Sequence, residues 1–356
     1  MYSRLLLVSL FLLAGVSTSL HAQTSYRVQA GQSLPAALTA AAAGDIIYVD
    51  GGIYGDITLT KKVILIGTGY FGAGSSVAPA EATLGTVQFK PGSQGSVIMG
   101  FLAANIEVGT STVTVARNHV SGHIWIGYCI GCGDYNWGAT ANDVTVRQNY
   151  VDSELAVATA VSGTSTVYNF SFKNNIVLNG FSSGGRVSGE YVNNTFGYKF
   201  DAGGFTTNNG PGGGGACQLQ SAVRYRNNIM VQPDGGACGV YTASLLPPVF
   251  SNNVLVNITV AGNTTLTGAQ AQSGLFVGWP TQTGTTITQD ARSQLKAGAV
   301  ALTAGEAGTQ AGAFGGDDPY VLSGIPFIPT ITQLTVPATV TQNGTLNVTV
   351  KAQTNN

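Results

Sequence analysis

The chain has 356 residues, of which 9% are charged, and its formal net charge is -1 at pH 7. This balance excludes a general electrostatic attraction to nucleic acid, which would need a basic patch or stripe, so no nucleic-acid partner is predicted. The 49 glycines and the many asparagine, threonine and serine residues favour an all-β solenoid with polar loops over a helical enzyme.

Residues 1–22 are predicted to be a signal peptide. Arg4 supplies a positive start, residues 5–16 form an apolar run too short to span a bilayer, and small residues lead to an expected cleavage site after Ala22. No later stretch reaches the roughly 18 uninterrupted apolar residues of a transmembrane helix. The mature protein is therefore expected to be exported, without a membrane span, to the extracellular space, the cell surface or the periplasm.

Residues 23–44 are predicted to form an N-terminal cap around one helix. Ser33 is a suitable N-cap residue, Pro35 suits the first turn, and Gly44 ends the segment. The apolar side of this helix would consist of Leu34, Ala37, Leu38 and Ala41. A helix followed directly by coils would cover the apolar end of a solenoid.

A repeated frame follows, within a solenoid that is predicted to span residues 45–310. Each copy has an asparagine, a large apolar residue three positions before it and an apolar residue two positions after it, as in Val115, Asn118 and Val120. The six asparagines are Asn118, Asn149, Asn175, Asn194, Asn228 and Asn253. They recur at intervals of roughly 20 to 35 residues, which is typical of a solenoid.

The frame also predicts how each coil is built. Positions five and three before the asparagine share one face of a strand, and because both are apolar in nearly every copy, that face should line the core. The asparagine is expected at a bend, since its amide bonds to nearby backbone and it tolerates left-handed backbone angles. Stacked asparagines would hydrogen-bond to one another as an amide ladder. A ligand pocket lined by asparagine is the alternative.

These features resemble the right-handed parallel β-helix superfamily of pectate-lyase-like proteins over residues 25–260. The matching motifs are Gly31-Gln-Ser-Leu34, the alanine-rich helix, Gly44-Asp-Ile-Ile-Tyr-Val49, Gly52-Ile-Tyr54 and Val63-Ile-Leu-Ile-Gly67. The resemblance implies a right-handed parallel β-helix. It implies much less about activity, because one fold hosts many functions.

Lyases of this superfamily usually combine a Ca²⁺ site of clustered acidic residues with a cationic base. The nearest matches are Asp152 with Glu154 and Lys199 with Asp201, and neither pair recurs at a matching offset on the next coil. A hydrolase would instead need two carboxylates about 5 to 9.5 Å apart, for which Glu190 and Asp201 are candidates. The catalytic candidates are thus Lys199, Asp201 and Glu190. Ca²⁺ is expected only if the protein is a lyase, and no other cofactor is indicated.

The four cysteines are an even number in a chain expected to be exported, so disulfides are predicted. Cys217 and Cys238 each follow Gly-Gly-Ala and lie about one coil apart, which favours a bond between them. Cys129 and Cys132 form a C-x-x-C motif, for which a structural disulfide is favoured over a redox pair or half of a zinc site. Zinc would need a second ligand pair at suitable spacing, so no metal site is predicted.

An aromatic-rich insertion between two coils supplies the first candidate binding residues. They are Trp125, Tyr128, Tyr135 and Trp137. Aromatic faces on exposed loops can stack on the apolar faces of sugar rings, and loops on a rigid scaffold are where binding concentrates. The alternative is that these rings cover the side of the rod as a satellite core.

The outward position two residues before the asparagine carries the other binding candidates. Arg147, Lys173 and Arg226 occupy this column. Such a stripe could follow an acidic polysaccharide, because arginine forks match carboxylate groups. The alternative is ordinary solubilising charge, which is common on exposed strand positions.

Residues 311–356 are predicted to form a closing segment and a C-terminal hairpin. Residues 311–329 resemble a tail found on secreted β-helix proteins. Residues 331–351 alternate as two strands, and Asn343-Gly344 lies in the joining turn, which is a strong hairpin signal. A lone hairpin is marginal in water, so it is expected to dock on the rod's end or on another protein.

The leading functional hypothesis is an exported β-helix that binds polysaccharide along its rod, with lyase or hydrolase activity left open. The alternative is a non-catalytic cell-surface adhesion or structural protein whose hairpin docks on a surface protein. A compact cluster of acidic and basic residues on the rod face would distinguish the two.

Overall fold

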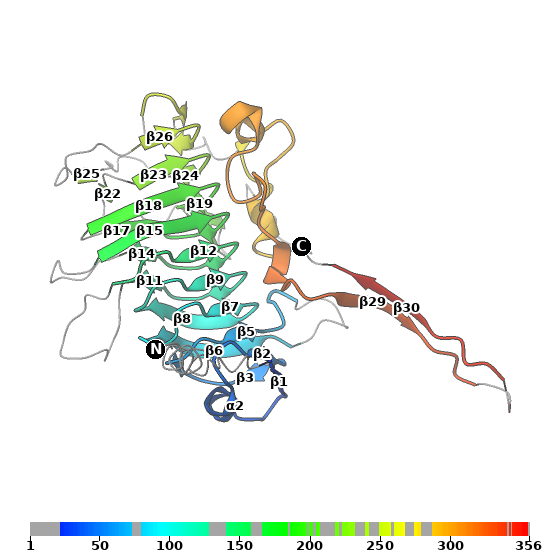
Figure 1. The fold of residues 1–356 in the computed structure, drawn as a ribbon. Coiled ribbons are helices and arrows are strands. Elements are labelled where there is room, and N and C mark those ends of the chain that lie inside the picture. The colour runs from blue at the N-terminus through cyan, green and yellow to red at the C-terminus, as the bar shows by residue number, and fades with distance from the viewer. Residues whose placement is uncertain are drawn as a thin grey trace, which may run out of the picture.

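The computed structural model describes residues 22–72, 80–127, 140–157, 166–183, 186–197, 199–201, 204–206, 218–220, 223–231, 239–241, 249–257, 260–267, 274–278, 287–339, 342 and 344–354. Within these residues the chain forms two large sheets of parallel strands and one α-helix (Figure 1). The predictions for the signal peptide, the four cysteines, Tyr128, Tyr135 and Trp137 fall outside the described residues.

The first sheet has ten strands, and its spatial order follows the order of the chain. Every neighbouring pair is parallel. Each turn of the chain therefore adds one strand to this sheet. The strands are β1 (Ser25–Val28), β2 (Ile46–Val49), β5 (Ile64–Ile66), β7 (Val97–Met99), β9 (Thr114–Ala116), β12 (Thr145–Arg147), β15 (Thr166–Lys173), β18 (Arg186–Val192), β23 (Val223–Arg226) and β26 (Val249–Ser251).

The second sheet has 14 parallel strands and divides into two arms beyond its long strand β8 (Leu102–Val108). Before the division lie β3 (Gly52–Ile53), β4 (Ile57–Leu59) and β6 (Ala82–Phe89). One arm consists of β10 (His119–Val120), β13 (Tyr150–Val151), β16 (Ile176–Val177), β19 (Thr195–Phe196), β24 (Ile229–Val231), β27 (Val254–Val256) and β28 (Thr264–Leu266). The other consists of β11 (Ile124–Ile126), β14 (Leu155–Val157) and β17 (Phe181–Ser183).

Successive turns of the chain thus visit the ten-stranded sheet and then both arms, as in β9, β10 and β11. Large parallel sheets with few helices are the content that the predicted parallel β-helix requires. Three small pairs of strands lie outside the large sheets, and two of them come before the C-terminal ribbon. These two are β20 (Lys199–Asp201) with β21 (Gly204–Thr206), which is antiparallel, and β22 (Gln218–Gln220) with β25 (Gly239–Tyr241), which is parallel.

The core lies between the sheets and is continuous along the stack. The position three residues before each frame asparagine points into it, as the alternation predicts, and Phe172, Tyr191 and Tyr225 are fully buried there. The rings of Tyr191 and Tyr225 stack with centroids 5.1 Å apart, and those of Tyr225 and Phe250 stack at 4.6 Å. Aromatic residues on successive coils therefore form a column inside the stack.

The bend of each coil differs from the prediction. The residue in the left-handed conformation is the one before the frame asparagine, with φ between 52° and 57°. These residues are Arg117, Gln148, Asn174, Asn193, Asn227 and Asn252. The frame asparagine directs its side-chain amide along the stack, and the residue before it adopts the left-handed conformation that turns the chain.

The helix α2 (Leu34–Ala40) lies at the end of the stack that holds β1 and β2 (Figure 1). The Ser33 hydroxyl accepts a hydrogen bond from the Ala36 amide at 3.2 Å, and Leu34 and Leu38 enter the core. The helix begins as predicted. It ends at Ala40, before the expected stop at Gly44, because Ala41 is already extended.

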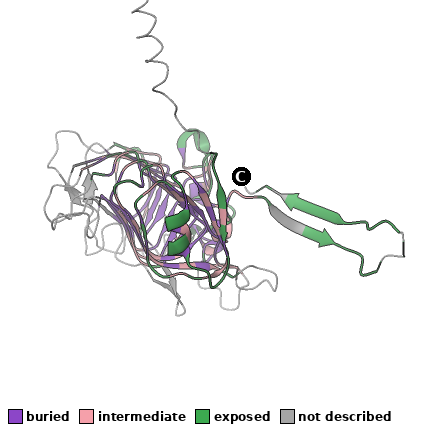
Figure 2. Cartoon of the chain, turned by 60° about the horizontal axis from the view of Figure 1, so that its bottom comes forward, coloured by how far each residue is buried: buried purple, intermediate pink, exposed green. Residues whose placement is uncertain are grey.

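Residues 287–328, here called the return segment, run back along one side of the stack (Figure 1). This segment contains four short 3₁₀ helices: η2 (Ala291–Ser293), η3 (Val300–Leu302), η4 (Glu306–Gly308) and η5 (Leu322–Gly324). After it, β29 (Thr330–Thr335) and β30 (Thr349–Gln353) pair antiparallel, as the alternation predicts. Their ribbon leaves the stack (Figures 1 and 2).

Candidate functional site

The frame asparagines are joined to one another by hydrogen bonds along the stack. Each Nδ2 donates to the Oδ1 of the next asparagine, at 3.1, 3.0, 2.9, 3.0 and 2.9 Å in order from Asn118 to Asn253. The backbone amide of each donates to the same oxygen. All six side chains are buried, so their polar atoms bind protein groups and do not form a ligand site.

The asparagine ladder contains a seventh member that the sequence frame does not predict. Asn253 Nδ2 donates to Asn263 Oδ1 at 2.7 Å, and its backbone amide donates to the same atom at 2.9 Å. Asn263 follows Asn253 by only ten residues, and Thr265 stands where the frame expects an apolar residue. This copy could not be recognised in the sequence, because its interval is short and a polar residue replaces the expected apolar one. The asparagine ladder is hereafter this set of seven.

The three cations predicted to form a stripe do share one register column of the ten-stranded sheet. However, each has an acidic partner. Arg147 lies 2.8 Å from Asp318, Lys173 lies 2.9 Å from Glu190, and Arg226 lies 2.8 Å from Glu306. Since Asp318 and Glu306 belong to the return segment, this segment supplies charges that compensate the column. The column is therefore a mixed-charge surface.

A groove between the column and the return segment shows the same mixture of charges. It is lined by Lys173 and Arg226 from the sheet and by Glu306, Asp317 and Asp318 from the return segment. The groove thus offers no uniform positive field to an acidic polymer.

The catalytic candidates lie on strands of different sheets. Glu190 lies in β18 of the ten-stranded sheet, where it pairs with Lys173 and accepts from the Ser171 hydroxyl at 3.3 Å. Lys199 and Asp201 lie in β20, which pairs only with β21, and their side chains are outside the described residues. Glu190 and Asp201 thus belong to different sheets.

Two histidines that carried no predicted role lie beside the acidic pair Asp152 and Glu154. His119 Nε2 is 2.9 Å from Asp152 Oδ2, and His123 Nδ1 is 4.0 Å from Glu154 Oε2. Each histidine stands on the coil before its acidic partner, because β10 pairs with β13 and β11 pairs with β14. The sequence signal was present as two histidines four residues apart, but the pairing needs the register of adjacent coils.

Trp125 extends this cluster along β11. Its ring stacks on the His123 ring with centroids 4.7 Å apart and planes inclined by 7°. The His123 amide donates to Asn105 Oδ1 at 3.0 Å, and the Ser153 hydroxyl lies 3.4 Å from His123 Nε2. The imidazole is therefore contacted by Trp125 on β11 and by Ser153 on the next coil, while Asn105 holds the backbone of His123.

A buried carboxylate stands beside Trp125 on the neighbouring strand. The parallel register of β8 and β11 pairs Glu107 with Trp125. Glu107 is only 3% exposed, and its Oε2 accepts from Gln88 Nε2 at 2.9 Å. Burial lowers the pKa of His123, and the nearby Glu154 opposes this by raising it. The imidazole is therefore mainly neutral near pH 7.

These residues form what we call the Trp125 face. Its members are Gln88, Asn105, Glu107, His123, Trp125, Ser153 and Glu154. All lie on β6, β8 and β11 or directly beside the ends of β11 and β14. Because these strands are hydrogen-bonded neighbours in one sheet, the scaffold holds the side chains in fixed positions.

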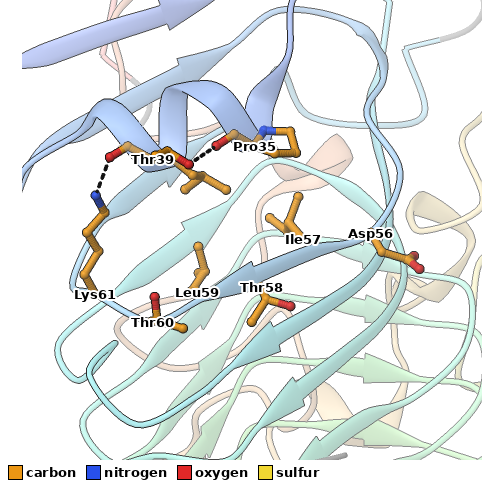
Figure 3. Close-up of a pocket in the computed structure, with 9 residues that line it drawn as sticks. Pro35, Thr39, Asp56, Ile57, Thr58, Leu59, Thr60 and Lys61 are labelled. Carbon is orange, nitrogen blue, oxygen red and sulfur yellow. Dashed lines mark hydrogen bonds between the residues drawn. The ribbon is translucent and has the colours of Figure 1, made fainter. Parts of the chain in front are cut away.

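A second hollow lies under the helix α2 (Figure 3). Thr39 Oγ1 donates to the Pro35 carbonyl at 2.9 Å, and Lys61 Nζ donates to the Thr39 carbonyl at 2.9 Å. Asp56 accepts from the Thr86 amide at 2.7 Å. These polar groups attach the helix and an adjacent coil, so this hollow is a weaker binding candidate than the Trp125 face.

Neither a metal cluster nor a membrane-spanning helix is found among the described residues. No group of three or more His, Cys, Asp or Glu side chains among them is arranged to hold a metal ion. In the same part of the chain, no helix is both long and apolar enough to cross a membrane.

Comparison with protein families, with curated proteins and with solved structures gives no match. The functional argument therefore rests on the residues of this chain.

Proposed function

We propose that the chain is an exported, right-handed parallel β-helix that binds neutral polysaccharide on the Trp125 face, with α2 as the cap of its first coil. The observation that carries the proposal is the stacked pair His123 and Trp125 with Glu107 and Glu154 on the two flanking strands. Export rests on the predicted signal peptide of residues 1–22.

The chemistry of the Trp125 face suits a sugar. A sugar ring has an apolar C–H face that packs on an aromatic ring, and hydroxyl groups around its edge that need hydrogen-bond partners. Trp125 supplies the aromatic ring, while Asn105 and Glu154 supply oxygens that accept from hydroxyl groups. Such a mixture of aromatic and convergent polar groups is typical of ligand sites.

The geometry also suits a polymer. Neighbouring strands lie about 4.8 Å apart, which is close to the length of one sugar unit, so successive coils could contact successive units. The strands are rigid elements, and binding groups placed on rigid elements lose little freedom when a ligand arrives.

The charges favour a neutral polymer over an acidic one. The Trp125 face carries Glu107 and Glu154 and a histidine whose pKa is lowered by burial. A uronic-acid chain would meet the acidic group of Glu154 there, and the cations expected to attract it are paired with acids. The proposed binding surface is therefore the Trp125 face instead of the column of cations, and the proposed ligand is a neutral polysaccharide instead of an acidic one.

Glycoside hydrolysis on the same face is the second candidate, because two carboxylates flank β11. The strand register places Glu107 and Glu154 two strands and two residues apart, or about 12 Å between Cα atoms. Side chains as long as glutamate can bring their carboxyl groups within the roughly 6.5 to 9.5 Å that an inverting hydrolase uses. The substitutions Glu107→Gln and Glu154→Gln test this candidate.

Affinity gels and a glycan array test the binding proposal. Trp125→Ala should weaken binding of a neutral polysaccharide by roughly tenfold, which corresponds to about 1.4 kcal/mol. Tyr168→Ala is the matched control, since Tyr168 is an exposed aromatic residue of β15 in the other large sheet. The proposal fails if the wild type binds no neutral glycan, or if both variants bind like the wild type. Reducing-end and unsaturated-product assays on the same polymers separate binding from hydrolase and lyase activity.

A further inference from the structure

The ribbon formed by β29 and β30 has one apolar face and one polar face. Leu334 lies opposite Val350, while the adjacent pairs are Thr335 with Thr349 and Gln333 with Lys351. Val336 and Val348 directly flank these two strands, and Leu346 lies two residues before Val348. Because side chains alternate along extended chain, these three share the side of Leu334 and Val350. The ribbon is therefore amphipathic.

Nothing in the described part of the chain covers the apolar face (Figure 2). Its exposed fractions are 61% for Leu334, 51% for Val336, 52% for Leu346, 47% for Val348 and 55% for Val350. These five make up half of the exposed large apolar side chains in the described residues. Single exposed apolar residues are ordinary, but a contiguous group marks an interaction surface.

We propose that two copies of this protein associate through these ribbons, face to face. Each ribbon would cover the apolar face of the other, and the four strands would form a small two-layer sandwich. Layers of this kind pack about 10 Å apart. The same surface on both partners gives a closed two-fold interface, so the assembly stops at a dimer.

The first argument for a second copy is charge. An occupant of this face must be a flat apolar strip without charged groups, since burying an unpaired charge is costly. The ribbon's own apolar face meets this requirement. In residues 329–356 the one charged side chain is Lys351, and its partner in the register is Gln333 on the polar face. Two ribbons can therefore stack without burying a charge.

The second argument is area. The five exposed side chains present about 400 to 500 Å² per copy, so face-to-face pairing removes about 900 Å² from water before the surrounding atoms are counted. Standard specific interfaces bury about 1,200 Å² or more, and weak transient ones bury less than that. The ribbon alone thus lies in the range of a weak, transient dimer. An isolated two-stranded ribbon is marginal in water, so pairing also stabilises the ribbon.

Sedimentation equilibrium of the full chain over a range of concentrations tests the inference. The wild type should pass from monomer to dimer, and the triple change Leu334→Thr, Val348→Thr and Val350→Thr should remain monomeric. Threonine keeps a β-branched shape suited to strands, so the ribbon itself is preserved. The matched control is Thr335→Ser with Lys351→Gln on the polar face, which should dimerise like the wild type. A wild type that stays monomeric throughout, or a triple variant that dimerises equally, overturns the inference.

Site-directed crosslinking distinguishes face-to-face pairing from strand addition at the ribbon's edges. A cysteine introduced as Val348→Cys should give an intermolecular disulfide with its counterpart, identified by peptide mapping. A cysteine introduced as Thr335→Cys, on the polar face, should not. Equal crosslinking at both positions would show edge pairing or irregular association, and would refute the proposed geometry. Neither experiment depends on the Trp125 face.

Discussion

The hydroxyl groups of Tyr70 and Tyr320 lie 2.7 Å apart, although 250 residues separate them in the chain. Tyr320 also donates to Asp290 at 3.2 Å, and the Ser323 amide donates to the same carboxylate oxygen at 2.6 Å. Tyr70, Tyr320 and Asp290 are all buried. The return segment is thus attached to an early coil by a buried polar network.

Tyr320→Phe tests the strength of this attachment. The change removes one hydroxyl and leaves the buried Tyr70 hydroxyl without this partner, while Asp290 keeps the amides of Ser323 and Ala291. We therefore expect a loss of about 1 to 3 kcal/mol in the free energy of unfolding. Urea denaturation measures this quantity. Tyr168→Phe, at an exposed tyrosine, serves as the control and should have little effect. Equal stability of both variants would show that the network does not hold the return segment.

The same tyrosines predict a loss of stability at alkaline pH. Burial, followed by the charge of Asp290, raises the pKa of Tyr70; burial raises that of Tyr320, with smaller contributions from Tyr70 and Asp290. Because the folded state holds these protons more tightly, their contribution is fully present below the unfolded pKa of about 10 and declines as the pH rises above it. The double variant Tyr70→Phe and Tyr320→Phe should show a shallower decline between pH 9 and 11 (roughly the window around that pKa). A decline as steep as that of the wild type would assign the effect to other tyrosines.

The asparagine ladder predicts that a middle position matters more than an end position. Asn175→Ala removes the oxygen that accepts both the backbone amide and the side-chain amide of Asn149. The buried backbone amide is left unpaired, while the side-chain amide keeps the Val115 and Arg147 carbonyls. We expect a loss of about 2 to 3 kcal/mol. Asn263→Ala removes the matching acceptor for Asn253, where the hydrogen bonds are partly exposed, and should cost about 1 kcal/mol because water can replace it. Chemical denaturation of the two variants gives the comparison, and equal losses would contradict it.

The arrangement of the coils could be predicted because it depends on local periodicity. Phe172, for example, stands between Ser171 and Lys173, and such alternation reveals which side of a strand faces the core. The spacing of the frame asparagines was informative because each coil contributes one. Asn263 escaped this pattern, since it belongs to a short final coil without the apolar residue that follows the others.

The partners of the candidate residues could not be predicted, because they come from distant segments. Arg147 shows this: its column was evident from the frame, but Asp318 reaches it from the return segment, 171 residues later in the chain. His119 and Asp152 meet across two coils whose register depends on the length of an insertion. Pairings of this kind follow from the stacking of the chain and leave no periodic trace in the sequence.

Replacing the three column cations separates the Trp125 face from the predicted cationic stripe. In the triple variant Arg147→Ser, Lys173→Ser and Arg226→Ser, we expect unchanged binding of neutral polysaccharide, because these side chains lie on the ten-stranded sheet and the Trp125 face lies on the other sheet. Stability should fall slightly, chiefly through Arg147, whose side chain is 23% exposed while those of Lys173 and Arg226 are 41% and 43% exposed. Exposed ion pairs contribute only about 0 to 1 kcal/mol each.

Salt dependence completes this test. Binding of a neutral polymer to the Trp125 face should change little between low and physiological ionic strength, because it uses stacking and hydrogen bonds. Binding of an acidic polymer to cations would weaken, since exposed charges are screened over about 8 to 10 Å. Arg27→Ser, which breaks a separate exposed ion pair with Asp50, is the control for a general loss of surface charge. If the triple variant alone loses binding, and salt abolishes the binding of uronic-acid polymers to the wild type, then the column is the binding surface and the Trp125 face is not.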